Sequence, residues 1–190
     1  MINLIVFLGN KGIAYEKSRH NAGWLLLDAT KEITLLGAWQ EKFHGRFTTG
    51  TWNSTKVHLL KPMTYMNESG KSVGALVRYF SIMPQKILVI HDDIELPFKT
   101  VKLQAGGSLA GHNGLRSIAS AIGSQQFNRL RIGIGRPVGM SVSSFVLGRF
   151  DEMEEAELPL VFHEARSMVS SWLQQGCREQ DLPMTLSVGS

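Results

Sequence analysis

Histidine and carboxylate side chains follow two apolar runs in this sequence of 190 residues. Residues 2–8 form the first run, which leads to Asn10 and then to His20. Residues 86–91 form the second run and are followed directly by Asp92. Buried strands of an open α/β sheet often carry functional groups just past their carboxyl ends, so these side chains could meet in space. A carboxylate beside an imidazole fixes its tautomer and favours its use as a base, although a surface or capping role is the alternative for each residue.

Two further segments place polar groups at turns that lead into helices. The segment KPMTYMNESG (61–70) puts Tyr65 and Asn67 at a strand-to-helix turn. The segment GGSLAGHNG (106–114) is rich in glycine, which lets backbone N–H groups approach a phosphate. It lacks the Lys-Ser/Thr ending of a P-loop and does not fit the dinucleotide fingerprint, so a plain flexible loop is the alternative.

The elements that must position these groups alternate between strand and helix. Besides the two apolar runs, strands are expected over 43–52, 56–61, 100–105 and 129–134, and helices over 21–33, 68–82, 114–122 and 152–175. Asn67 and Asn113 are expected to cap their helices, and Pro159 is expected to break or restart the last one. This order predicts a single-domain α/β fold, a three-layer sandwich with a twisted mixed β-sheet between helices.

Composition limits the classes of protein to consider. The chain is 43% hydrophobic and long enough to bury a core without disulfides. It has one cysteine, so no internal disulfide can form, which suits a reducing cytoplasm. Its first apolar run is too short for a membrane span and has no basic leader. Five of the 16 acids lie within residues 151–157, which leaves 20 basic and 11 acidic residues elsewhere. A basic body favours a polyanionic partner such as a nucleic acid.

The motifs, taken in order, resemble the bacterial peptidyl-tRNA hydrolase family. They are GNKGIAYEKSRHNAG (9–23), KPMTYMNESG (61–70), HDDIELP (91–97), GHNGLRS (111–117), RLRIGIGRP (129–137) and FVLGRF (145–150). The resemblance extends from residue 1 to about residue 175. It implies hydrolysis of the ester bond of N-blocked peptidyl-tRNA, which releases peptide and free tRNA and recycles tRNAs dropped during translation.

The resemblance also implies roles for individual residues. His20 matches the general base that activates water, Asp92 matches the acid that holds it, and Asn10 matches an amide that senses a blocked amino group. Arg131 matches an arginine near the tRNA 5′-phosphate. Further substrate or tRNA contacts are implied for Tyr15, Tyr65, Asn67 and Asn113. His112, beside Asn113, is expected only to shape its loop. No cofactor and no metal ion are implied.

The same resemblance sets boundaries and partners. Residues 1–176 are expected to form the hydrolase domain, with a lid loop and terminal helix over about 138–176, and residues 177–190 to form a loosely ordered tail. The expected partner is peptidyl-tRNA, with no membrane contact. We expect a cytoplasmic monomer. Two alternatives remain. One is a non-catalytic RNA-binding relative, and the other is a metal-dependent hydrolase that uses His20, His91, His112, Asp92 and Asp93.

This chain departs from the family pattern at a few positions. Lys11 stands where proline is usual, and Lys99 and Ala110 stand where glycine is usual. Gln104 falls where some members carry a lysine that contacts phosphate. Ser18 replaces threonine and Glu95 replaces aspartate. None of these changes affects the proposed catalytic residues.

Overall fold

A computed structural model describes residues 2–30, 35–175 and 184–187. Its strands are β1 (Asn3–Phe7), β2 (Leu35–Leu36), β3 (Gln40–Lys42), β4 (Gly45–Trp52), β5 (Thr55–Pro62), β6 (Ile87–Asp93), β7 (Thr100–Ala105), β8 (Asn128–Gly133) and β9 (Met184–Ser187). Its α-helices are α1 (Ala22–Thr30), α2 (Ser69–Phe80), α3 (Asn113–Ile122), α4 (Val142–Leu147) and α5 (Glu152–Gln175). Short 3₁₀ turns cover Ile13–Tyr15, Arg19–Asn21, Met66–Glu68 and Pro84–Lys86.

One mixed sheet joins the described strands in the order β2-β4-β5-β1-β6-β8-β7-β9, and β3 pairs with β4. The central strands β5, β1, β6 and β8 run parallel, whereas β4 and β7 pair antiparallel on either side of them. The carboxyl ends of β1 and β6 therefore lie side by side at one edge of the sheet. The apolar residues of these two strands are fully buried, as expected for central parallel strands.

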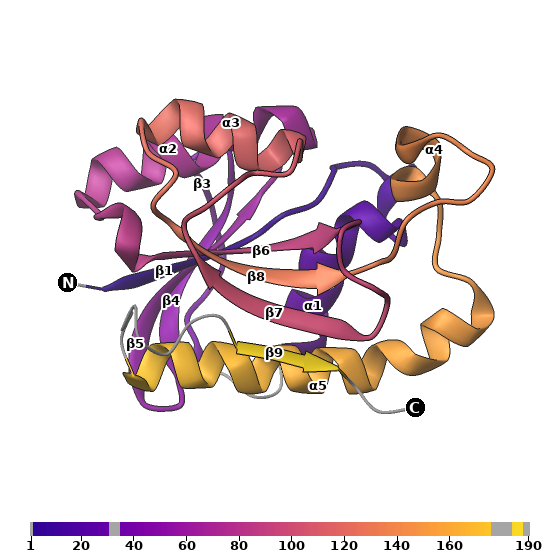
Figure 1. The fold of residues 1–190 in the computed structure, drawn as a ribbon. Coiled ribbons are helices and arrows are strands. Elements are labelled where there is room, and N and C mark those ends of the chain that lie inside the picture. The colour runs from indigo at the N-terminus through magenta and orange to yellow at the C-terminus, as the bar shows by residue number, and fades with distance from the viewer. Residues whose placement is uncertain (1, 31–34, 176–183, 188–190) are drawn as a thin grey trace.

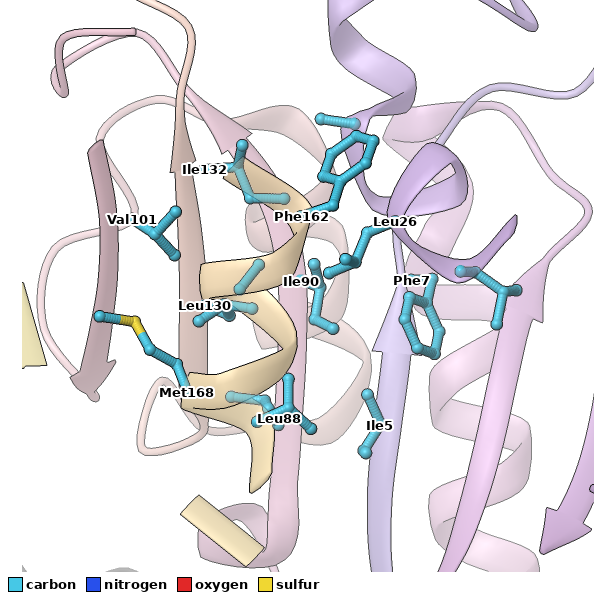
Figure 2. Packing of buried hydrophobic residues seen from close by; sticks show 14 of the residues in the cluster. Ile5, Phe7, Leu26, Leu88, Ile90, Val101, Leu130, Ile132, Phe162 and Met168 are labelled. Carbon is cyan, nitrogen blue, oxygen red and sulfur yellow. The ribbon is translucent and has the colours of Figure 1, made fainter. Parts of the chain in front are cut away.

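Helices cover both faces of the sheet, with α2 and α3 on one face and α5 and α1 on the other (Figure 1). Alternate residues of β1 point to opposite faces: Ile5 and Phe7 pack with α1 and α5, whereas Leu4 and Val6 pack with α2 and α3. Figure 2 shows the first of these cores, where Phe162 and Met168 of α5 lie over Leu88, Ile90, Leu130 and Ile132 of the sheet. The predicted three-layer sandwich with a mixed sheet is confirmed.

Several details differ from the sequence predictions. Helix α5 continues through Pro159 without a break. The proline is the eighth residue of the helix and removes one backbone hydrogen bond. An apolar stripe at spacings of three and four residues, from Leu158 to Trp172, packs the rest of α5 on the sheet. The prediction of a break at Pro159 was therefore wrong.

Part of the expected tail over 177–190 forms a strand. Residues Met184–Ser187 are β9, which pairs antiparallel with β7 at the edge of the sheet. The weak hydrophobic pattern of this segment does not predict a strand. The remainder of the tail and residues 31–33 of the expected first helix lie outside the described residues. In the described part of the chain, no helix is long and apolar enough to cross a membrane.

Candidate active site

A cleft of about 360 Å³ opens where the carboxyl ends of β1 and β6 meet the start of α3. Strand β1 leads into Asn10, and β6 ends with Asp92 and Asp93. The lining residues are Asn10, His20, Met66, Asn67, Asp92, Asp93, Ile94, Ala110, Gly111, His112, Asn113, Val142, Ser143, Val146 and Leu147. Five of the eight residues that the resemblance assigned to the site thus share one cleft: Asn10, His20, Asn67, Asp92 and Asn113.

His20 and Asp92 form a hydrogen-bonded pair at the centre of this cleft. His20 lies in the 3₁₀ turn just before α1, and its Nδ1 is 2.8 Å from Oδ1 of Asp92. The side chain of Asp92 is only 2% exposed. A carboxylate can only accept, so the hydrogen lies on Nδ1 of His20 and Nε2 is left with a free lone pair. Such an imidazole can accept a proton from water.

Opposing effects set the pKa of His20. Burial lowers it, but the charge of Asp92 and the hydrogen bond to that carboxylate outweigh burial and raise the pKa of His20 above 6.5. Burial raises the pKa of Asp92. The neighbouring imidazoles His20 and His112 lower it by more, so that the pKa of Asp92 lies well below its usual range. The carboxylate therefore stays charged across the pH range in which the histidine titrates.

A second imidazole contacts the same carboxylate oxygen. Nε2 of His112 lies 3.1 Å from Oδ1 of Asp92, and its Nδ1 accepts hydrogen bonds from the backbone N–H groups of Gly114 and Leu115. Because Nδ1 accepts, the ring hydrogen lies on Nε2 and is donated to Asp92. His112 is therefore the N-cap of α3, and the expectation that Asn113 caps this helix was wrong.

The signal that could have identified His112 is its position directly before a helix in a glycine-rich segment. A histidine there can cap the helix with one ring nitrogen and reach across the cleft with the other. Gly114 makes room for this arrangement, since a Cβ at that position would lie 2.5 Å from Sδ of Met66 and 3.1 Å from Cε1 of His112.

His91 lies behind this group and is fully buried. Its Nδ1 donates to the backbone oxygen of Asp92 at 2.6 Å, and its ring packs edge-on against His112 at 4.9 Å. Burial, followed by the neighbouring His112, lowers the pKa of His91 to about 3. His91 is therefore a neutral packing residue behind Asp92 and does not offer a proton near neutral pH.

Asp93 points to the other face of the sheet, as the alternation of a strand predicts. Its Oδ2 accepts a hydrogen bond from Nε of Arg131 at 2.7 Å. A terminal nitrogen of Arg131, Nη1, donates to Oε1 of Gln104 at 2.7 Å. The guanidinium proposed to contact a phosphate is thus held between an acid and an amide, and its side chain is 14% exposed.

Asn10 is held rigidly by its neighbours. Its side-chain oxygen accepts the backbone N–H of Met66 at 2.7 Å, while its own backbone N–H and C=O bond to the side chain of Asn21 at 2.8 and 3.0 Å. The accepting oxygen fixes the orientation of the amide. Asn10 therefore presents its NH₂ group as a donor to a ligand in the cleft.

Asn67 and Asn113 line the cleft with exposed side chains. Asn67 does not cap α2 as expected, because a 3₁₀ turn over Met66–Glu68 comes first and α2 begins at Ser69. Without a capping task, the amides of both residues are available to a ligand.

The two tyrosines do not line this cleft, contrary to expectation. Tyr15 ends a short 3₁₀ turn and is half-buried. Tyr65 is 49% exposed and lies under the ammonium of Lys11, which is 5.0 Å from its ring centre. Tyr65 is therefore neither a core residue nor a wall of the catalytic cleft.

Helix α4 forms one wall of the cleft through Val142, Val146 and neighbouring residues. Arg19, next to His20, anchors the segment that follows this helix. Its guanidinium lies 4.3 Å from the ring of Phe145 and pairs with Glu154 at 2.6 Å, and its backbone N–H bonds to Gly148. The segment expected to act as a lid is thus tied to the turn that carries the histidine (Figure 1).

His20, Asp92 and His112 also offer donor atoms within 4.8 Å of one another, as a metal site would require. Both imidazoles approach the same carboxylate oxygen at hydrogen-bonding distances of 2.8 and 3.1 Å. Backbone N–H groups occupy the other nitrogen of His112. This arrangement is typical of a hydrogen-bonded relay, and chelation provides a direct test of the metal alternative.

Comparison with known proteins identifies the family of this chain. The sequence pattern of the family described as "Peptidyl-tRNA hydrolase" matches residues 4–185. The chain is 40% identical over 187 residues to the peptidyl-tRNA hydrolase of Geotalea uraniireducens, covering 98% of this chain and 95% of that protein. It is 46% identical over 154 residues to the enzyme of Bacillus pumilus, covering 80% and 82% of the two chains. The crystal structure of peptidyl-tRNA hydrolase from Acinetobacter baumannii superposes with a TM-score of 0.83 at 40% identity, over 94% of this chain and 91% of that one. This chain belongs to the peptidyl-tRNA hydrolase family.

Proposed function

We propose that this protein hydrolyses the ester bond between a peptide and its tRNA, with His20 as the general base. The observation that carries the proposal is the His20–Asp92 pair, which faces a cleft that also contains Asn10, Asn67 and Asn113. Family membership supports the substrate, because the related proteins carry the name peptidyl-tRNA hydrolase. Such an enzyme would recycle tRNAs from peptidyl-tRNAs dropped during translation and would act in the cytoplasm.

The chemistry follows from the free nitrogen of His20. Nε2 takes a proton from a water molecule as the water oxygen attacks the ester carbonyl. Asp92 stabilises the imidazolium that forms, because its carboxylate lies 2.8 Å from Nδ1. The imidazolium then returns the proton to the departing ribose oxygen, so that free tRNA and a peptide carboxylate leave. Side-chain amides of Asn67 and Asn113 line the same cleft and are candidates to donate to the oxyanion.

Asn10 accounts for a preference for blocked amino groups. Its oxygen is occupied by the N–H of Met66, so the amide can only donate to the substrate. Both substrates have the ester carbonyl, but an amide carbonyl oxygen on the α-nitrogen is available to accept that bond only when the amino group is acylated. A free ammonium group offers donors alone and would face the NH₂ of Asn10 without a bond.

The test is release of tRNA from N-acetyl-aminoacyl-tRNA and from the same aminoacyl-tRNA with a free amino group, each with and without EDTA. We expect hydrolysis of the blocked substrate, much slower hydrolysis of the free one, and no effect of EDTA. Binding of tRNA without hydrolysis would favour the non-catalytic alternative. Loss of activity in EDTA that added metal restores would assign His20, Asp92 and His112 to a metal site.

A further inference from the structure

A second cleft lies beside the catalytic one. It has a volume of about 590 Å³, and its walls come from Lys11, from the turn between β3 and β4, and from the segment around Thr64 and Glu68. The two clefts share a wall: Asn10 and Met66 line the first, while their neighbours Lys11 and Thr64 line the second. Backbone hydrogen bonds from Lys11 to Thr64 and from Met63 to His44 hold this wall together.

Positive charge dominates the second cleft. Its ionisable lining is Lys11, Glu41, Lys42, His44, Glu68 and Lys71. Both acids are already matched, because Glu68 pairs with Lys71 and Glu41 lies 3.5 Å from Arg46. Among the described residues, neither Lys11 nor Lys42 forms an ion pair with an N···O distance within 4.0 Å, although the charge of Lys11 adds to the larger effect of Lys71 in lowering the pKa of Glu68. Each instead lies over aromatic rings: Lys11 over Tyr65 at 5.0 Å, and Lys42 over Tyr79 at 4.3 Å.

Both ammonium groups therefore remain available to an anionic ligand. Cation–π contacts hold a lysine near a ring face without neutralising its charge. The exposed side chain of Lys11 and that of Lys42 can each turn toward a carboxylate that enters the cleft.

The sheet order places this cleft on one side of the catalytic centre and Arg131 on the other. Strand β4, which lies next to Lys42, is two strand positions from β1, with β5 between them. On the other side, β8 carries Arg131 and is the direct neighbour of β6, and β7 lies beyond β8. With strands about 4.8 Å apart, the lysine cleft lies roughly 10 Å from the ester position.

The peptide and the tRNA must leave the ester carbon in different directions. If the tRNA lies toward Arg131, the peptide runs toward Lys11 and Lys42. An extended chain covers about 3.3–3.6 Å per residue, so the second and third residues from the ester would reach this cleft.

We infer that this second cleft binds the peptide part of the substrate and selects acidic side chains two or three residues from the ester bond. The inference rests on the proposed function, since it assigns a subsite to that reaction. Lys11 and Lys42 are the residues that determine the specificity.

The test uses three substrates, N-acetyl-X-X-alanyl-tRNA with X as Glu, Gln or Lys, at low ionic strength. For the unmodified protein we expect kcat/KM to be about three- to ten-fold higher for the Glu substrate than for the Gln substrate, and lowest for the Lys substrate. In the double variant Lys11→Gln/Lys42→Gln, the Glu-to-Gln ratio should fall to about one. The control Lys56→Gln removes an exposed lysine at the start of β5, the end of that strand away from the cleft, and should keep the Glu-to-Gln ratio. Thermal unfolding of each variant checks that the fold is retained.

Each other outcome is decisive. Equal hydrolysis of the three substrates by the unmodified protein, or a ratio that survives in the double variant, would overturn the inference while leaving the proposed function intact. The double variant could instead lower kcat/KM for all three substrates and weaken inhibition by free tRNA to the same extent. That result would mean that the cleft binds RNA, and the inference would be overturned. Hydrolysis of none of the three would contradict the proposed function and the inference with it.

Discussion

One carboxylate oxygen organises the proposed catalytic residues of this protein. Oδ1 of Asp92 accepts hydrogen bonds from both His20 and His112, and the two imidazoles keep Asp92 charged despite its burial. The charge of Asp92 in turn raises the pKa of His20. His112 is itself fixed by the backbone at the start of α3. The position of the proposed base, His20, thus depends on a helix that begins more than ninety residues later in the chain.

The first prediction concerns pH. A general base must be neutral, so kcat/KM should rise with pH through the pKa of His20, which lies above 6.5. In Asp92→Asn, the charge that raises this pKa is absent while burial still lowers it. The plateau should fall by about 10²–10⁴ and the midpoint should move to lower pH. In Asp93→Asn, which disturbs the contact with Arg131 instead, the plateau of kcat/KM should fall far less. A midpoint that stays in place in Asp92→Asn would contradict this origin of the pKa.

The second prediction separates the two tasks of His112. Asn is a good N-cap, so His112→Asn should keep α3 and the melting temperature while losing the hydrogen bond to Asp92. We expect kcat to fall about ten-fold with little change in KM, the size of a lost bond to a charged group. His112→Ala should show the same loss of kcat and a further loss of about 1 kcal/mol of stability. If His112→Asn retained full kcat, His112 would serve only as a cap.

At the scale of elements, the hydrophobic pattern predicted the position of a strand or helix correctly where the pattern was strong. The runs in β1 and β6, the turn at Asn53 and Ser54, and the stripe of α5 all lie where the sequence indicated. Local sequence signals gave the wrong secondary structure where tertiary contacts determine it. Packing on the sheet carries α5 through Pro159, and pairing with β7 orders β9 despite its weak pattern.

The site was predictable only in part, for a physical reason. Strand alternation allows only one of Asp92 and Asp93 to face His20, and the family resemblance selects Asp92. Contacts between loops do not follow from periodicity, so the capping by His112 was not foreseen. The same holds for Tyr65, whose place beside Lys11 depends on how two turns meet.

A third prediction tests strain at Lys99, which has a φ of 67° and pairs with Glu157 of α5 at 2.8 Å. Lys99→Ala and Lys99→Gly both lose this half-exposed pair, which contributes little. They differ in backbone freedom, because only glycine adopts a left-handed conformation without cost. Lys99→Gly should therefore be more stable than Lys99→Ala by about 1 kcal/mol in denaturant unfolding. Equal stabilities would show that position 99 carries no strain.

At the scale of the whole molecule, charge is distributed to suit a polyanionic substrate. The acids at the start of α5 are partly matched by cations from the site side of the fold, since Glu154 pairs with Arg19 and Glu157 with Lys99. Basic side chains flank the catalytic cleft on both sides, with Arg131 toward β7 and Lys11 toward β4.

A fourth prediction tests Arg131 as a phosphate contact. Arg131→Ala would leave the buried Asp93 unpaired, so Arg131→Gln is the better variant, because an amide can still donate to that acid. The slope of log Kd against log salt for uncleavable peptidyl-tRNA should flatten by about 0.7–0.9, and KM should rise more than kcat changes. Lys86→Gln, at the opposite ends of the strands, serves as the control. An unchanged slope in Arg131→Gln would remove this residue from the phosphate site.

The most direct test of the account is the single-turnover rate of tRNA release from N-acetyl-aminoacyl-tRNA by the unmodified protein and by His20→Ala, with tRNA affinity measured separately. His20→Ala removes the base and leaves Asp92 bound to His112. We predict a rate lower by about 10²–10⁴ with affinity for tRNA largely retained. A rate close to that of the unmodified protein would contradict the assignment of His20 as the base.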